Sequence, residues 1–172
     1  MECIGVITDK DVLGTDGMSN AIPRYRASAI VENSEGLYAV MYSHKFNFYS
    51  LPGGGIEEGE SIRDALIREI SEETGCFCNY IEELGYVEEN RKHCDYRQIT
   101  YFYIVKTKTV GRSLNLTDAE VDNQTEVQWH PLEEAERLIL TQKCETSQRK
   151  FFKAREMNAL SAYHLRSRKK YE

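Results

Sequence analysis

The sequence has no long apolar run and no excess of positive charge. No run of about 18 consecutive apolar residues occurs in the sequence, so we expect neither a transmembrane helix nor a membrane partner. The start, MECIGVITDK, lacks a basic region followed by an apolar run, so we expect no secretion signal and a cytoplasmic location. The formal net charge of −6 argues against a nucleic-acid polymer as partner, because phosphate backbones bind surfaces rich in lysine and arginine. An acidic protein can still bind a nucleotide through a metal ion.

Cysteine pairs with the spacing of zinc ligands are also missing. The number of cysteines is odd, and no two of them have the CxxC spacing. They are Cys3, Cys76, Cys78, Cys94 and Cys144. We therefore expect reduced, buried thiols. The histidines are scattered, with no cysteine or histidine partner at metal spacing: His44, His93, His130 and His164. We interpret them as surface or hydrogen-bonded histidines.

Composition and periodicity predict one α/β domain. With 41% hydrophobic and 29% charged residues, the 172-residue chain resembles an ordinary soluble domain. We divide it into an N-terminal lead-in, 1–22, that can contribute one strand, and a domain over 23–172 that includes a C-terminal helix. Strands are predicted at 3–8, 24–32, 37–43, 47–51, 76–90, 98–108 and 125–131, and helices at 62–74, 132–141 and 147–166. We expect 24–32 and 37–43 to form a hairpin and 9–23 to be irregular. This order predicts a mixed sheet covered by helices.

Residues 54–76, GGIEEGESIRDALIREISEETGC, concentrate carboxylates in one turn and one helix. On a helical wheel, Ile62 and Leu66 define an apolar stripe. The same stripe continues onto Glu69 and Glu73, where a packed helix normally carries leucine or isoleucine. Because buried unpaired carboxylates are very unfavourable, a cation is expected beside them.

A divalent metal ion suits this cluster better than a basic side chain. Glu72 shares the side of Glu69, and Arg68 can pair with Glu72 but cannot balance three carboxylates. The preceding LPGGG, residues 51–55, lets backbone groups approach an ion or a phosphate closely. Magnesium prefers carboxylate and carbonyl oxygens and commonly bridges to phosphates.

This stretch resembles the Nudix box, the signature of the Nudix hydrolase superfamily. The matching positions are Gly54, Glu60, Arg68-Glu69-Ile70, Glu72-Glu73, Gly75 and Cys76. The last position usually holds an aliphatic residue, and Cys76 is small and apolar. The resemblance covers residues 54–76 and implies a Nudix-type α/β/α sandwich with a mixed sheet between helices.

The resemblance also implies roles for individual residues. The metal ligands would be three glutamates and one glycine carbonyl: Glu69, Glu72, Glu73 and Gly53 or Gly54. The cofactor would be Mg²⁺, with Mn²⁺ as a substitute. Arg68 would hold the glutamates in place by salt bridges, supported by Glu60.

Many family members take a further carboxylate, acting as base or ligand, from a loop outside the box. Here residues 117–126 offer Asp118, Glu120, Asp122 and Glu126. Spacing favours Glu120. Substrate contacts are expected from the glycine loop and the aromatic residues before it: Gly53, Gly54, Gly55 and Tyr49, with Phe48 beside it.

The implied function is divalent-metal-dependent hydrolysis of the diphosphate linkage in a nucleoside diphosphate derivative. The substrate classes are a nucleoside triphosphate, a damaged nucleotide, a nucleotide sugar such as ADP-ribose, and a dinucleotide. A non-catalytic nucleotide sensor on the same fold is the alternative, and it would normally lack some of the box carboxylates. An isomerase would need an additional cysteine–glutamate pair, for which Cys94 alone gives little support. Analogy with the family also admits a homodimer formed through the N-terminal strand.

Overall fold

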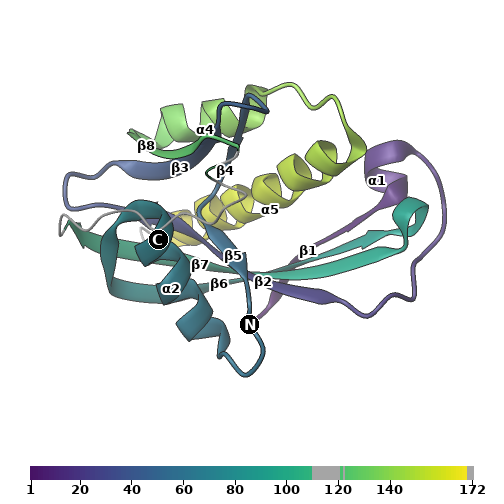
Figure 1. The fold of residues 1–172 in the computed structure, drawn as a ribbon, viewed down its shortest axis with the longest axis horizontal. Coiled ribbons are helices and arrows are strands. Elements are labelled where there is room, and N and C mark those ends of the chain that lie inside the picture. The colour runs from purple at the N-terminus through teal and green to yellow at the C-terminus, as the bar shows by residue number, and fades with distance from the viewer. Residues whose placement is uncertain (110–120, 122, 170–172) are drawn as a thin grey trace.

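One mixed sheet organises the chain (Figure 1). The computed structural model describes residues 1–109, 121 and 123–169. Within them the strands are β1 (Cys3–Thr8), β2 (Arg24–Glu32), β3 (Tyr38–Ser43), β4 (Phe48–Ser50), β5 (Gly53–Gly55), β6 (Cys76–Arg91), β7 (Tyr96–Thr109) and β8 (Thr125–His130). The helices are α1 (Asp9–Leu13), α2 (Ile62–Thr74), α4 (Leu132–Thr141) and α5 (Ser147–Lys169). In these ranges no helix is long and apolar enough to cross a membrane.

Strand pairing joins distant parts of the sequence. The strand order is β1-β6-β7-β2-β3-β4, with β5 added on β2 and β8 on β3. β6 and β7 form a long antiparallel pair around the short 3₁₀ turn η1 (Lys92–Cys94). β2 runs parallel to β7, from Arg24 opposite Gln98 to Glu32 opposite Lys106. The N-terminal strand β1 pairs in parallel with β6 at one edge of the sheet.

Side-chain alternation along β2 separates two hydrophobic cores. Ala27, Ala29 and Val31 pack with Leu66 and Ile70 of α2 on one face. On the other face, Ile30 belongs to a second cluster that also contains residues of α4 and α5, including Ala135, Ile139, Phe151 and Leu160. α2 and α5 therefore lie on opposite sides of the sheet (Figure 1), and the predicted α/β/α class is confirmed.

One local prediction is confirmed in a shortened form and another is wrong in part. The expected hairpin of residues 24–32 and 37–43 is present, because β2 and β3 are antiparallel neighbours and the Asn33 amide donates to the Leu37 carbonyl at 2.9 Å. Its ladder is short, with one pair, Glu32 and Tyr38, since β2 otherwise pairs with β7 and β5 while β3 pairs with β8 and β4. The segment after β1 is not wholly irregular. Its first residues form α1, where the Asp11 carboxylate accepts hydrogen bonds from the Thr8 amide at 2.8 Å and hydroxyl at 2.7 Å. This bonding stabilises the start of a helix.

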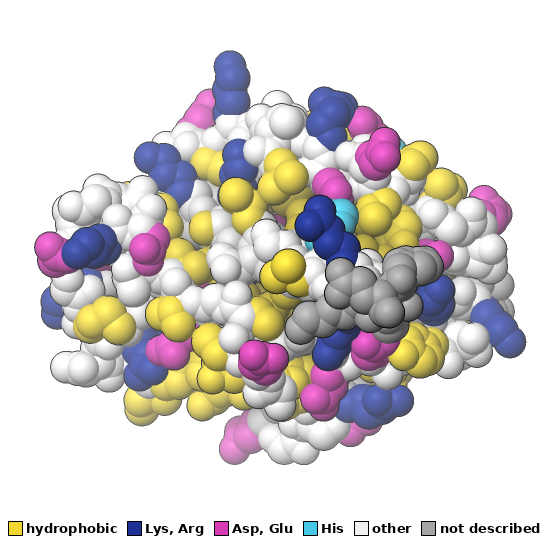
Figure 2. Space-filling model, turned by 180° about the vertical axis from the view of Figure 1, so that it is seen from behind, with side chains coloured by type: hydrophobic (Ala, Val, Ile, Leu, Met, Phe, Trp, Pro, Cys, Tyr) yellow, Lys and Arg dark blue, Asp and Glu magenta, His cyan; other side chains and the backbone are white. Residues whose placement is uncertain are grey.

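Thiols and surface charge complete the description. All cysteines are free, but Cys3 and Cys94 are exposed, so the expectation that the thiols are buried holds fully only for Cys76. Figure 2 shows acidic and basic side chains interspersed over one face of the described molecule, without one sign dominating.

Candidate active site

The helix α2 has the predicted bounds, and local signals explain both ends. The Ser61 hydroxyl accepts a hydrogen bond from the Asp64 amide at 3.1 Å, which satisfies one free amide of the first turn. Gly75 adopts a left-handed conformation with φ of 67°, and its amide donates to the Ser71 carbonyl at 3.0 Å. This is the usual geometry just past a helix end.

The inward side of α2 carries carboxylates, as the wheel predicts. Leu66 and Ile70 are fully buried, and Glu69 and Glu73 are only 9% and 4% exposed. Glu72 is partly buried on the adjoining side. Burial raises the pKa of Glu69 above its ordinary value, against the opposing effect of nearby Arg68. A cation beside this carboxylate would favour its charged form.

Arg68 connects the carboxylates of the box. Its Nε and Nη2 donate to the two oxygens of Glu60 at 2.9 and 3.0 Å. Its Nη1 donates to Glu69 at 2.7 Å and to Glu72 at 3.3 Å, and its Nη2 also reaches the Gly55 carbonyl at 2.9 Å. Hydrogen bonding to Glu60 is the main reason that the pKa of Arg68 is raised. The same bond is the main reason that the pKa of Glu60 is lowered. One guanidinium thus fixes three carboxylates relative to β5.

The glycines form a strand, not the loop expected from LPGGG. Gly53 has φ of +140°, and a Cβ there would lie 2.3 Å from the Ala27 carbonyl oxygen, so only glycine fits beside β2. A Cβ at Gly54 would lie 2.1 Å from Oε1 of Glu69. The Gly53 amide donates to Glu73 Oε2 at 2.6 Å. Close packing of β5 therefore positions two of the predicted metal ligands.

The donor chemistry of this cluster suits a hard divalent cation. In the described ranges, no three acidic, histidine or cysteine side chains converge closely enough to hold a metal ion as they stand. Glu69 and Glu72 point to Arg68, and the Gly53 carbonyl accepts a hydrogen bond from Arg26 Nη2. The carboxylates nevertheless share one side of α2 next to backbone oxygens of β5, which is the oxygen set that magnesium prefers.

The remaining predicted residues lie elsewhere. Asp118, Glu120 and Asp122 lie outside the described residues. Glu126 is on β8, within 3.3 Å of His44 Nε2 and 2.6 Å of Gln128 Nε2. The other histidines also have side-chain partners. His93 pairs with Asp9, His130 with Gln128 and His164 with Glu136.

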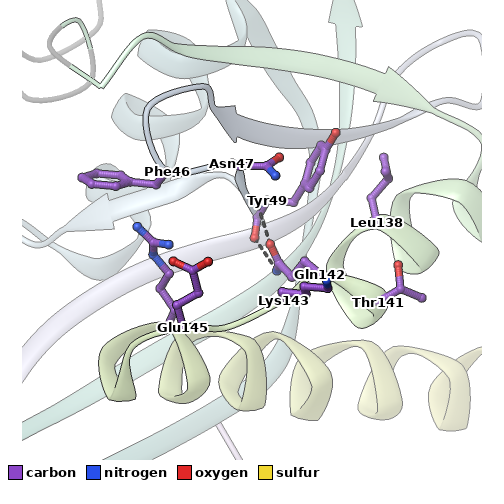
Figure 3. A pocket seen from close by; sticks show the side chains of 9 residues that line it. Phe46, Asn47, Tyr49, Leu138, Thr141, Gln142, Lys143 and Glu145 are labelled. Atoms are coloured by element: carbon purple, nitrogen blue, oxygen red, sulfur yellow. Dashed lines mark hydrogen bonds between the residues drawn. The ribbon is translucent and has the colours of Figure 1, made fainter.

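Tyr49 and Phe48 point into different cavities, because neighbours on β4 alternate in direction. Tyr49 lines a cavity of about 400 Å³ (Figure 3). The Tyr49 amide donates to Gln142 Oε1 at 2.7 Å, and Gln142 Nε2 donates to the Tyr49 carbonyl at 2.9 Å. The Tyr49 ring stacks on Tyr42 at 4.5 Å between centroids. None of the box glutamates lines this cavity. A substrate contact by Tyr49 stays a prediction.

Phe48 instead borders a larger cavity of about 670 Å³ that sequence reasoning missed. Its basic lining residues come from β2, β6 and α5: Arg24, Arg26, Arg91 and Arg155. No local motif joins these arginines. Only the strand pairing and the packing of α5 bring them together.

The sequence profile of the NUDIX domain family matches residues 22–154, most of the chain. The chain belongs to the Nudix family. Among its relatives, Nudix hydrolase 5 of Arabidopsis thaliana is 28% identical over 120 residues. Those residues are 67% of this chain and 38% of that protein, so the Nudix chain spans well under half of this relative's length.

Solved structures share the Nudix fold. A NUDIX hydrolase from Nitrosomonas europaea superposes with a TM-score of 0.61 at 17% identity, covering 84% of this chain and 90% of the other. The NUDIX domain of Shewanella oneidensis NrtR, complexed with ADP ribose, gives a TM-score of 0.53 at 21% identity, covering 66% and 76%. At these identities the similarity establishes the fold alone.

Proposed function

We propose that this Nudix chain is a divalent-metal-dependent hydrolase that cleaves the diphosphate linkage of a nucleoside diphosphate derivative. The observation that carries the proposal is the row of Glu69, Glu72 and Glu73 on α2, packed against β5. Arg68 pairs with Glu69 and Glu72, and the Gly53 amide donates to Glu73. All carboxylates of the box are present, which favours a hydrolase over a sensor that has lost them. The similarity to proteins named Nudix hydrolase and to a domain complexed with ADP ribose supports the same reading.

Each residue has a distinct task in this proposal. Glu69, Glu72 and Glu73 would hold Mg²⁺ or Mn²⁺, with a carbonyl of Gly53 or Gly54. The ion would supply charge neutralisation at the diphosphate. Arg68 keeps the carboxylates apart and oriented through its bonds to Glu60 and Gly55.

The reaction itself is a hydrolysis. A water attacks one phosphorus and gives its proton to a carboxylate, for which Glu120 stays the prediction from the family resemblance. The phosphorus–oxygen bond to the other phosphate breaks, and that phosphate leaves with the electron pair and takes up a proton. Most of the rate gain would come from positioning and charge stabilisation. A cytoplasmic location and a homodimer through the edge strand β1 stay predictions.

The test is a screen of nucleoside triphosphates, nucleotide sugars, ADP-ribose and dinucleotides with Mg²⁺, followed by phosphatase and phosphate detection. The wild type should turn over at least one class. The variant Glu72→Gln should fold normally and lose turnover by about 100-fold or more. Normal turnover by Glu72→Gln would show that the site is assigned wrongly.

A further inference from the structure

The cavity of about 670 Å³ on the α5 side of the sheet is basic and has aromatic walls. Four arginines line it, together with the rings of Phe48, Phe152 and Tyr96. The guanidinium of Arg91 lies 4.7 Å from the ring centre of Tyr96, and that of Arg155 lies 4.9 Å from Phe152. Stacking on rings holds these planar groups in place.

Buried glutamates pair with two of these arginines. Glu89 accepts a hydrogen bond from Arg91 Nε at 3.0 Å and another from Arg155 Nη1 at 3.0 Å. Glu156 accepts from Arg155 Nη2 at 2.9 Å, and both glutamates are fully buried. The charges of Glu73, Glu156 and Glu69 also act on Arg26.

Arg24 adds a further charge at the exposed end of β2. Its guanidinium lies 5.7 Å from the ring centre of Tyr96. The cavity therefore combines a buried network of arginines and glutamates with one exposed arginine, Arg24.

Two donors of the cavity lack acceptors. The Nε atoms of Arg26 and Arg155 are buried and have no hydrogen-bond partner in the described part of the chain. Arg155 is only 3% exposed. A buried donor without an acceptor is costly, so a ligand that brings oxygen atoms would be favoured here.

The cavity adjoins the glutamate cluster. Arg26 lines it and donates from Nη2 to the carbonyl of Gly53. The amide of the same glycine donates to Glu73 at 2.6 Å. Gly53 of β5 therefore connects an arginine of the basic cavity to one of the proposed cation ligands through two hydrogen bonds.

We propose that this cavity binds a phosphate group beyond the diphosphate that is cleaved. The substrate is then a nucleoside triphosphate or another nucleoside polyphosphate, not a nucleotide sugar whose distal group is neutral. Arginine suits the task because its fork of N–H groups matches phosphate oxygens in pairs. This inference rests on the proposed function and narrows its substrate class.

Kinetics of Arg24→Gln test the proposal, because Arg24 is exposed and its loss should not impair folding. Nucleoside triphosphates are compared with ADP-ribose and ADP-glucose. The wild type should prefer triphosphates, and Arg24→Gln should raise their KM about tenfold while leaving the KM for ADP-ribose unchanged. Arg168→Gln makes the same charge change at an exposed site of α5 outside the cavity. It should alter neither the KM for triphosphates nor the KM for ADP-ribose. Equal effects of Arg24→Gln on both substrate classes, or none on triphosphates, would overturn the proposal.

Calorimetry with inorganic triphosphate in EDTA separates this inference from hydrolysis. The wild type and Glu72→Gln should bind it equally, and Arg24→Gln should bind it about tenfold more weakly. Absence of binding by the wild type would mean that the arginines form an ion-pair network with a structural role only. Binding without turnover of any diphosphate would instead refute the hydrolase and leave the anion site standing.

Discussion

Arg68 donates hydrogen bonds to both carboxylate oxygens of Glu60, at 2.9 Å from Nε and 3.0 Å from Nη2. This paired contact fixes the plane of the guanidinium. The remaining nitrogen, Nη1, then faces Glu69 and Glu72. Glu60 is thus a positioning residue that acts on the cluster through Arg68.

Glu60→Gln should lower kcat by about 10- to 100-fold, because the amide keeps one acceptor but loses the charge that orients Arg68. The KM should change little, and the melting temperature should stay within a few degrees. Steady-state kinetics and thermal unfolding measure this. Glu58→Gln, at an exposed position, is the control and should retain wild-type kcat. An unchanged kcat in Glu60→Gln would contradict the role.

Gly54→Ala should reduce turnover more than stability. The new Cβ would lie 2.1 Å from Glu69 Oε1 and 2.2 Å from its Cδ, so the carboxylate must move. A displacement of about 1 Å can cost about 100-fold in rate. Gly55→Ala is the steric control, because a Cβ there meets nothing within 4 Å, and it should keep wild-type melting temperature and cation affinity. If Gly54→Ala and Gly55→Ala bound the cation with equal affinity, the role of Gly54 in positioning Glu69 would be refuted.

Local signals in the sequence predict some elements and not others. The bounds of α2 follow from Ser61 and Gly75, and its buried glutamates follow from periodicity. The cap between Thr8 and Asp11 is also a local signal, but the surrounding glycine, aspartate and serine favour an irregular segment. The strand β5 has no such signal, because three glycines acquire a strand conformation only by pairing with β2.

Gln142→Ala should lower the free energy of unfolding by about 1–2 kcal/mol, since two hydrogen bonds to the Tyr49 backbone are lost. Urea unfolding measures the change. Lys143→Ala, at an exposed neighbouring position, should stay within about 0.5 kcal/mol of wild type. If the two variants were equally stable, the link between β4 and the segment after α4 would be energetically unimportant.

The free energy of unfolding should fall as the pH rises from 9.0 to 11, because of the Cys78 thiol. Burial raises the pKa of this thiol from 9.0 to about 11. In this window the unfolded chain releases the proton and the folded chain keeps it, so rising pH favours unfolding. Melting temperatures of wild type and Cys78→Ala across the window test this. The decline should be shallower in the variant, and parallel curves would exclude the contribution.

The basic cavity could not be predicted from the sequence. Arg26 and Arg155 are far apart in the chain and meet because α5 packs on the face of β2 opposite α2. The box, by contrast, is contiguous, so the sequence alone is enough to single out its glutamates. Long-range pairing, such as β2 with β7, is not encoded in a local pattern.

Calorimetric titration of Mn²⁺ into the wild type and Glu72→Gln, with and without nucleotide, tests the central claim most directly. The wild type should take up the ion saturably, and Glu72→Gln should bind it at least about tenfold more weakly, because a carboxylate ligand is lost. Undetectable uptake by the wild type under both conditions, or equal affinity in the two proteins, would contradict a cation site on α2.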